Sequence, residues 1–131
     1  WDLTSKTCTA TLTGHSFYGH SGSLSSDGTT LCSGSDDKSI KVWDLTLMTC
    51  TATLTGHSFY VHSVSLSSDG TTLCSGGADG RIKVWDLTSK RCTGTLTSHS
   101  SAVLSVSLSS DGMTLCSGSA DRASKCGTSL Q

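Results

Sequence analysis

Residues 1–126 consist of three consecutive copies of a 42-residue unit, followed by a short tail at 127–131. The first two copies, 1–42 and 43–84, align without a gap and are identical at 34 of 42 positions. The third copy, 85–126, matches the second at 28 of 42 positions. Repeats of this length stack on their neighbours, because one unit alone cannot bury its apolar face. The whole chain is therefore predicted to be one domain of three repeats.

Each unit contains four short stretches with the pattern of β-strands. In the second unit these are Thr51–Thr55, a stretch marked by Val61, Val64 and Leu66, then Thr72–Ser75 and Ile82–Trp85. Asp69-Gly70 and Asp79-Gly80 separate them as turn signals. The chain has no Pro, Asn or Glu and shows no helical period, while Thr and Val favour sheet. An all-β fold is predicted.

The order of these signals resembles the WD-repeat β-propeller family. The second unit carries the Gly56-His57 pair, two Asp-Gly turns and a closing Trp85-Asp86. The resemblance implies four-stranded antiparallel blades, in which the strand after each Trp-Asp pair is the outermost strand of the preceding blade. Blades are then expected at about 16–55, at 58–97 and from about 101 onward, and Thr7–Thr13 is expected to be an outer strand whose own blade is missing. Three blades do not close a ring, so an incomplete propeller is predicted.

Histidine, serine and aspartate recur together in every unit. The sets are His15, Ser33 and Asp37, then His57, Ser75 and Asp79, then His99, Ser117 and Asp121. One interpretation of these sets is the catalytic triad of a serine hydrolase. The chain lacks a Gly-x-Ser-x-Gly motif, and a catalytic site does not usually occur in three copies at fixed spacing. We therefore predict that the chain is not an enzyme.

The resemblance gives these residues a structural role instead. In WD repeats an indole donates to the serine, the serine to the histidine and the histidine to the aspartate. Trp43 and Trp85 stand at the offset that this tetrad needs, whereas Gly127 occupies the equivalent position in the third unit. A buried indole, hydroxyl and imidazole all need partners, and one chain of hydrogen bonds satisfies all three.

Two of the three units depart from the pattern in their strands. Gly19 and Gly22 replace Val61 and Val64 in the first unit. In the third, the stretch at 122–127 carries Ser124 and Cys126 where the second unit has Ile and Val. An open arc would also expose apolar residues at its ends, and we expect Leu12 to be exposed at one end and Leu115 at the other. Head-to-tail self-association would cover them, but the weakened strand at 122–127 predicts non-specific association rather than a defined dimer.

Six of the seven cysteines follow the repeat. Cys8, Cys50 and Cys92 are spaced by 42 residues, and so are Cys32, Cys74 and Cys116. Equivalent positions in neighbouring blades need not approach within disulfide range. We expect small buried hydrophobic residues in a reducing compartment, with no disulfide framework. Because no Cys-x-x-Cys pair is present, no metal site is predicted; Cys126 lies outside the pattern.

The resemblance also implies where a partner would bind. WD-repeat proteins commonly use the narrow face, where loops entering the inner strands meet loops before the third strands. The corresponding positions are Tyr18, His20, Asp36, Tyr60, His62 and Ala78. Phe17 and Phe59 are expected to pack between blades. The third unit has Ser101, Ala102, Leu104 and Ala120 at these positions, so the patch does not continue into it.

Charge and hydropathy narrow the class of partner. The formal net charge is −1, which gives no electrostatic footprint for nucleic acid or an acidic membrane. No apolar run approaches the roughly 20 residues of a membrane span, and no signal peptide is visible. Since the sequence starts at Trp1 in mid-motif, we expect a fragment of a larger WD-repeat protein, intracellular and cytoplasmic.

The predicted function is a non-catalytic scaffold module that binds other proteins or peptides without a cofactor. One alternative is a regulatory or sensor array of a signalling NTPase or other enzyme, although no Gly-x-x-x-x-Gly-Lys motif is present. The other alternative is a decayed or self-assembling structural segment.

Overall fold

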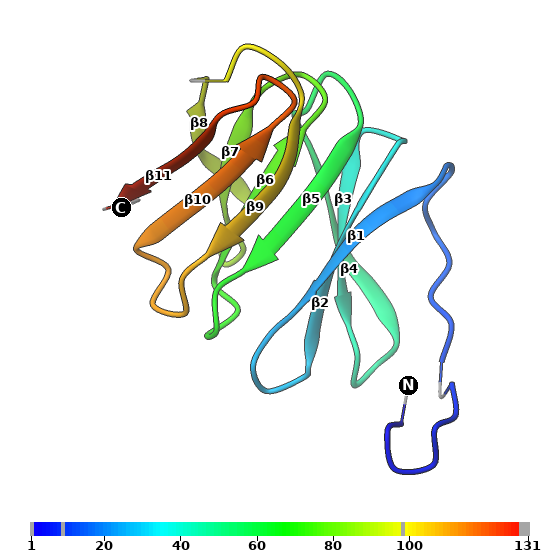
Figure 1. Cartoon of the computed structure of the whole chain (residues 1–131). Coiled ribbons are helices and arrows are strands. Elements are labelled where there is room, and N and C mark those ends of the chain that lie inside the picture. Colours follow the sequence, from blue (N-terminus) through cyan, green and yellow to red (C-terminus); the bar gives the residue numbers. More distant parts are fainter. Residues whose placement is uncertain (1, 9, 98, 129–131) are drawn as a thin grey trace.

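The computed structural model describes residues 2–8, 10–97 and 99–128. In these residues the chain forms three antiparallel sheets and no helix, which confirms the predicted all-β, incomplete propeller (Figure 1). Blade 1 comprises β1 (Gly19–Leu24), β2 (Thr30–Ser35), β3 (Ser39–Asp44) and β4 (Thr49–Thr55). Blade 2 comprises β5 (Val61–Leu66), β6 (Thr72–Gly77), β7 (Ile82–Asp86) and β8 (Arg91–Leu96). Blade 3 comprises β9 (Val103–Leu108), β10 (Thr114–Ser119) and β11 (Ser124–Thr128).

The strands of each blade pair in chain order, and the blades stand side by side as an open arc. The inner strands β1, β5 and β9 are neighbours along this arc (Figure 1). Each strand that follows a Trp-Asp pair is the outermost of its blade, since β4 pairs with β3 and β8 with β7. The N-terminal segment trails away beside blade 1.

Asp-Gly turns close the hairpins between first and second strands. Gly28, Gly70 and Gly112 all have a φ near +75°, the left-handed region that favours glycine. In blade 2, Oδ1 of Asp69 accepts the Thr71 N–H at 3.0 Å and the Ser67 hydroxyl at 2.7 Å. These bonds hold the pKa of Asp69 below its ordinary value of 3.8.

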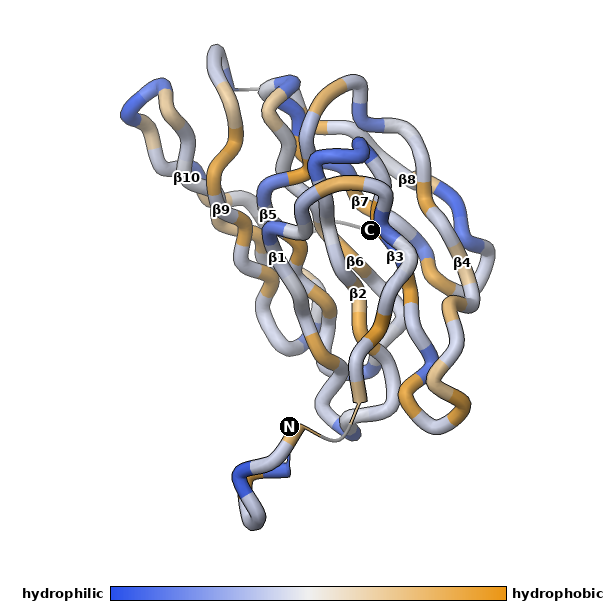
Figure 2. The backbone as a smooth tube through the Cα atoms, turned by 90° about the vertical axis from the view of Figure 1, so that its right-hand side faces the viewer, coloured by the Kyte–Doolittle hydropathy of each residue, from blue (hydrophilic) through white to orange (hydrophobic). Residues whose placement is uncertain are grey.

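The apolar core lies between the blades rather than within one of them. One cluster joins Cys32, Ile40, Val42 and Leu54 of blade 1 to Val61, Val64, Leu66, Leu73 and Trp85 of blade 2. A second cluster joins Cys74, Ile82 and Val84 of blade 2 to Val103, Val106 and Leu115 of blade 3. In Figure 2 orange stretches lie along several of these strands and are interrupted by paler, less hydrophobic ones. Because successive side chains alternate between faces, each blade offers one apolar face to each neighbour.

Leu115 is therefore not exposed at the end of the arc, and that expectation was wrong. It is only 4% exposed and belongs to the cluster between blades 2 and 3. Its neighbour Cys116 takes the opposite face of β10, the one that points away from blade 2.

The expected outer strand at Thr7–Thr13 is also not seen. Trp1 and Thr9 lie outside the described residues. In the described part of this stretch, the only pairing is an isolated bridge between Asp2 and Thr7. In blades 1 and 2 the third strands β3 and β7 pair with β4 and β8, whereas in the part of the chain that the structure describes no strand pairs with the stretch 7–13.

The cysteines divide into groups that the repeat spacing did not predict. Cys32 and Cys74 are buried as expected, and burial raises the pKa of each thiol to about 12. Cys8, Cys50 and Cys92 are exposed, because Cys50 and Cys92 lie on the outermost strands and Cys8 precedes the blades.

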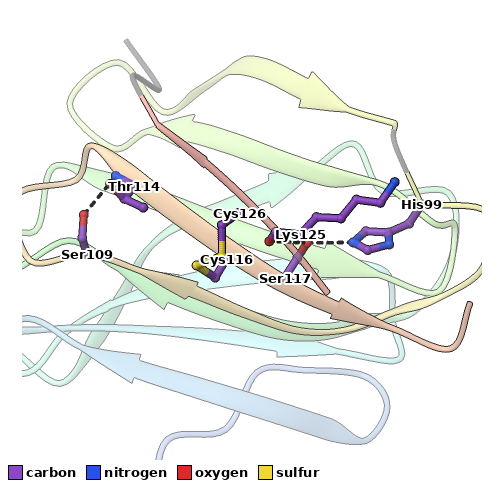
Figure 3. The surroundings of a disulfide bond; sticks show 7 residues. All are labelled: His99, Ser109, Thr114, Cys116, Ser117, Lys125 and Cys126. Atoms are coloured by element: carbon purple, nitrogen blue, oxygen red, sulfur yellow. Dashed lines mark hydrogen bonds between the residues drawn. A yellow bond between two sulfur atoms is a disulfide. The ribbon is translucent and has the colours of Figure 1, made fainter. Parts of the chain in front are cut away.

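Cys116 and Cys126 form a disulfide, which corrects the expectation that no disulfide would form (Figure 3). The two residues are direct partners in the β10–β11 register. The 42-residue spacing relates equivalent cysteines of neighbouring blades, whereas this disulfide joins two adjacent strands of one blade.

Among the residues that the structure describes, no helix has the length and apolar character needed to cross a lipid bilayer.

Candidate functional site

The His-Ser-Asp set of blade 2 lies inside the blade together with Trp85. His57 comes from the loop between β4 and β5, Ser75 from β6, Asp79 from the β6–β7 turn and Trp85 from β7. The Trp85 indole donates to Ser75 Oγ at 2.8 Å. His57 Nε2 lies 2.7 Å from Ser75 Oγ, and His57 Nδ1 lies 3.0 Å from an Asp79 carboxylate oxygen. The side chains of His57 and Asp79 are 1% and 4% exposed.

The two ends of this chain of bonds set its direction. The indole can only donate to Ser75 Oγ and the Asp79 carboxylate can only accept from His57 Nδ1–H, so Nε2 of the neutral ring accepts the proton of the Ser75 hydroxyl. His57 Nδ1–H then donates to Asp79, which defines a neutral imidazole protonated at Nδ1. Burial lowers the pKa of His57 below its ordinary 6.5 and outweighs the opposing effect of Asp79. Burial alone would raise the pKa of Asp79, but hydrogen bonds from the Arg81 and Ser58 amides and from His57 bring it below 3.8.

Blade 1 repeats this geometry. The Trp43 indole donates to Ser33 Oγ at 2.9 Å, and His15 lies 2.8 Å from Ser33 Oγ and 2.9 Å from Asp37. Asp37 also accepts the Ser39 hydroxyl and amide. Although burial opposes it, these bonds from Ser39 and the bond from His15 lower the pKa of Asp37 well below the usual range.

Blade 3 keeps three of the four residues. His99 lies 2.7 Å from Ser117 Oγ and 3.0 Å from Asp121. Where the other blades have an indole, β11 has Gly127, and the Lys125 carbonyl lies 3.5 Å from Ser117 Oγ (Figure 3). Ser117 therefore accepts no indole hydrogen bond.

The serine of blade 2 is poorly placed for nucleophilic attack. Ser75 is fully buried, and one lone pair of its oxygen already accepts the indole proton. A nucleophile needs an approach path for the substrate and a nearby pair of oxyanion donors. Ser75, His57 and Asp79 follow the same hydroxyl–imidazole–carboxylate order as the catalytic residues of serine hydrolases, but here all three side chains are buried within the blade.

The residues predicted for partner binding are linked at one end of blades 1 and 2. The Asp36 N–H donates to the Tyr18 carbonyl at 2.8 Å, and the Ala78 N–H donates to the Tyr60 carbonyl at 2.8 Å. His20 pairs with Asp36. The His20 and His62 rings meet edge to face with centroids 5.3 Å apart. We call Tyr18, His20, Asp36, Tyr60, His62 and Ala78 the loop face.

Phe17 and Phe59 do not pack between blades as expected. They are 62% and 47% exposed, and each contacts the adjacent tyrosine ring edge to face. The valines of β5 already fill the space between blades 1 and 2, so Phe59 extends into solvent beside the loop face. Phe17 is exposed in the same way before β1. An open cavity of about 370 Å³ lies against His15–Tyr18.

Several serines that join neighbouring elements were not predicted. Ser35 Oγ donates to the Tyr18 carbonyl at 2.7 Å and accepts the Asp37 N–H at 3.1 Å, which fixes the loop before β1. Ser21 and Ser23 accept backbone N–H groups of blade 2. Ser21 and Ser23 recur at 42-residue intervals in all three units, whereas Gly77 stands at the position of Ser35 in the second, and serine is so frequent in this chain that the pattern does not stand out.

The three stretches 6–44, 48–86 and 90–125 match the family described as WD domain, G-beta repeat. The chain belongs to the WD-repeat family. Domains of this family generally serve as scaffolds for protein interaction. A search of curated proteins found no match to this WD-repeat chain. Within 2–8, 10–97 and 99–128, no group of three or more His, Cys or acidic side chains could hold a metal ion.

Proposed function

We propose that this WD-repeat chain is a non-catalytic module that binds a protein or peptide through the loop face. The observation that carries the proposal is the contrast between two sets of histidines. His57 is enclosed in its blade, whereas His20 and His62 meet at the loop face beside exposed aromatic rings. Tyrosine and neighbouring aromatic residues give large contact area at low entropic cost and are frequent binding anchors.

The tetrads serve a structural role in this proposal. Each ties the second and third strands of a blade to the loop that enters the inner strand. In blade 2 that loop runs from His57 to Tyr60, so the tetrad also fixes the base of the loop face. The Asp79 carboxylate accepts the Ser58 N–H at 3.1 Å, which adds a backbone anchor to the same loop.

A protein or peptide is a better partner for this face than nucleic acid or a membrane. The net charge of the chain is −1, and the only basic groups on the loop face are two imidazoles, one of them paired with Asp36. Phosphate backbones and anionic lipids both require clusters of Lys or Arg.

The proposal is tested by selecting peptides from a random display library on the full chain. Selected peptides are expected to lose at least about tenfold in affinity for a Tyr18→Ala/Tyr60→Ala variant. Leu47→Ala is the matched control, since Leu47 is 69% exposed in the β3–β4 turn and lies outside the loop face. Peptides that bind both variants as tightly as the wild type would overturn the proposal.

A further inference from the structure

A cavity of about 430 Å³ lies between blades 1 and 2, at the end of the blades opposite to the loop face. Tyr18 and Asp36 of the loop face stand where β1 begins and β2 ends, whereas the cavity reaches Thr30, where β2 begins. In Figure 1 the β1–β2 and β3–β4 turns at this end lie at the bottom of the view. We call this space the junction cavity, and its wall includes Val42, Trp43, Asp44, Thr46, Leu87 and Lys90.

The β7–β8 turn of blade 2 forms one wall of the junction cavity and is fixed in place. The Leu87 N–H donates to the Thr71 carbonyl at 2.9 Å, and the Leu87 side chain packs against the cluster between blades 1 and 2. Lys90 then reaches across to blade 1, where its ammonium donates to the Thr51 carbonyl at 3.2 Å. The positive charge is therefore held beside the cavity by both blades.

The Lys90 ammonium has hydrogen-bond donors left for a ligand. An ammonium carries three N–H groups, and Thr51 takes one of them. Every ion pair among the described residues joins a histidine to an aspartate, so no carboxylate in this part of the chain neutralises Lys90. A carboxylate bound at this point would accept the remaining donors in charge-assisted hydrogen bonds, which are stronger than neutral ones.

Blade 1 contributes a carboxylate to the same cavity, that of Asp44 at the end of β3. Its Oδ1 accepts the Thr46 hydroxyl at 2.5 Å, the Leu47 N–H at 3.2 Å and the Thr46 N–H at 2.8 Å. These bonds hold the pKa of Asp44 below its ordinary 3.8, so the group is ionised at neutral pH. Its Oδ2 accepts no hydrogen bond from the described residues and is available to a donor on a ligand.

The cavity wall also includes apolar groups from both blades. Val42 and Trp43 are 7% and 5% exposed, and Leu87 packs on the cluster to which Val42 belongs. Such a wall stabilises an aliphatic side chain that leaves water. One water molecule takes up about 30 Å³ in the liquid, so the cavity holds about fourteen waters, comparable with the non-hydrogen atoms of a dipeptide.

A cation, a free carboxylate oxygen and an apolar wall together match the last residue of a polypeptide. That residue carries a carboxylate, an amide N–H and a side chain on one Cα atom. An internal Glu or Asp would use its side chain to reach Lys90, which leaves no aliphatic group for Val42 and Leu87. A small inorganic anion would be repelled by Asp44 and has no donor to offer it.

We propose that the junction cavity binds the free C-terminus of a partner polypeptide that ends in an aliphatic residue. The terminal carboxylate accepts hydrogen bonds from Lys90, and the last amide N–H donates to Asp44 Oδ2. The aliphatic side chain packs against Val42 and Leu87. The site shares no residue with the loop face, so the inference does not rest on the function proposed for that face.

The ligand side is tested by titrating the full chain with N-acetyl-glycyl-leucine and recording nitrogen-15 NMR spectra. The amide signals of Thr46, Leu87 and Lys90 are expected to shift and to saturate, while those of Tyr18 and His62 stay in place. N-acetyl-glycyl-leucinamide lacks the carboxylate and should bind at least about tenfold more weakly. Equal binding of acid and amide, shifts confined to the loop face, or no saturable shift up to about 10 mM would overturn the proposal.

Free leucine is the second probe, because it keeps the carboxylate and the side chain but replaces the amide by an ammonium. It is expected to bind more weakly than N-acetyl-glycyl-leucine, since it lacks the preceding residue that fills the rest of the cavity. Binding as tight as that of the acetylated dipeptide would indicate a site for free amino acids and would overturn the assignment to a chain terminus.

The protein side is tested by Lys90→Met, which removes the charge and keeps an unbranched side chain. Met48 is the equivalent residue of blade 1, and both positions have a left-handed backbone, with φ of 55° and 60°, so this fold accepts methionine there. The variant should bind N-acetyl-glycyl-leucine at least about tenfold more weakly. Lys83→Met is the matched control, since Lys83 donates to Thr95 at 3.1 Å and does not line the cavity. An equal loss of affinity in both variants, or none in Lys90→Met, would contradict the proposed contact.

Discussion

Replacing Ser75 by Ala should destabilise the fold more than the same change at Ser117. Ser75 Oγ is the shared partner of the Trp85 indole and His57 Nε2, at 2.8 and 2.7 Å. Ser75→Ala leaves both groups unpaired inside the blade, at a cost of about 1–3 kcal/mol each, or about 2–6 kcal/mol together. Ser117→Ala leaves His99 Nε2 without its partner at 2.7 Å and removes the long 3.5 Å contact with the Lys125 carbonyl, so about 1–3 kcal/mol is expected.

The assay is urea unfolding followed by far-ultraviolet circular dichroism, which does not rely on the fluorescence of any tryptophan. The difference between the two serine variants estimates the free energy of the indole hydrogen bond. A double-mutant cycle with Trp85→Phe and Ser75→Ala isolates the same interaction, and a coupling of about 0.5–3 kcal/mol is expected. The reasoning fails if Ser75→Ala costs no more than Ser117→Ala, or if the coupling is near zero.

Three further outcomes follow from the burial of these groups. The pKa of His57 lies below 6.5, so the unfolded chain binds the proton first, and the free energy of unfolding should fall as the pH drops below 6.5. Equal urea midpoints at about pH 7.5 and 5.5 would contradict this. A thiol reagent should modify the exposed Cys50 and Cys92 in the native state but not the buried Cys74, because burial raises the pKa of its thiol to about 12. Protection of all three cysteines from the reagent would contradict this prediction. A serine-reactive phosphonate should leave Ser75 unmodified, and stoichiometric labelling there would show a reachable nucleophile.

The strands and their grouping into blades could be predicted from the sequence. Asp69-Gly70 and Asp79-Gly80 mark turns whose geometry is local, and Val61–Leu66 alternates with the period of a strand. The position of β4 outside β3 came from the resemblance to WD repeats, and the pairing of these strands agrees with it. Residue types at fixed offsets were also enough to select the residues that meet around Ser75.

The features that were missed depend on which neighbour a side chain faces. Cys50 and Cys92 recur like buried residues, yet they lie on outermost strands that no further strand covers. Cys116 forms its disulfide with Cys126. The first two units have no cysteine at the position of Cys126, so the repeat spacing gives no partner for it. Phe59 is exposed because the valines of β5 already occupy the space between the blades. Such outcomes depend on packing between blades, which the pattern within one unit does not encode.

The central claim is that the His-Ser-Asp sets are internal links of the blades. The most direct test is nitrogen-15 NMR of the His57 imidazole in the full chain. The hydrogen bonds to Ser75 and Asp79 predict a neutral ring protonated at Nδ1 at about pH 7.5, and burial predicts that its pKa lies below 6.5. A ring protonated at Nε2, or one that titrates with a pKa at or above 6.5, would contradict the account.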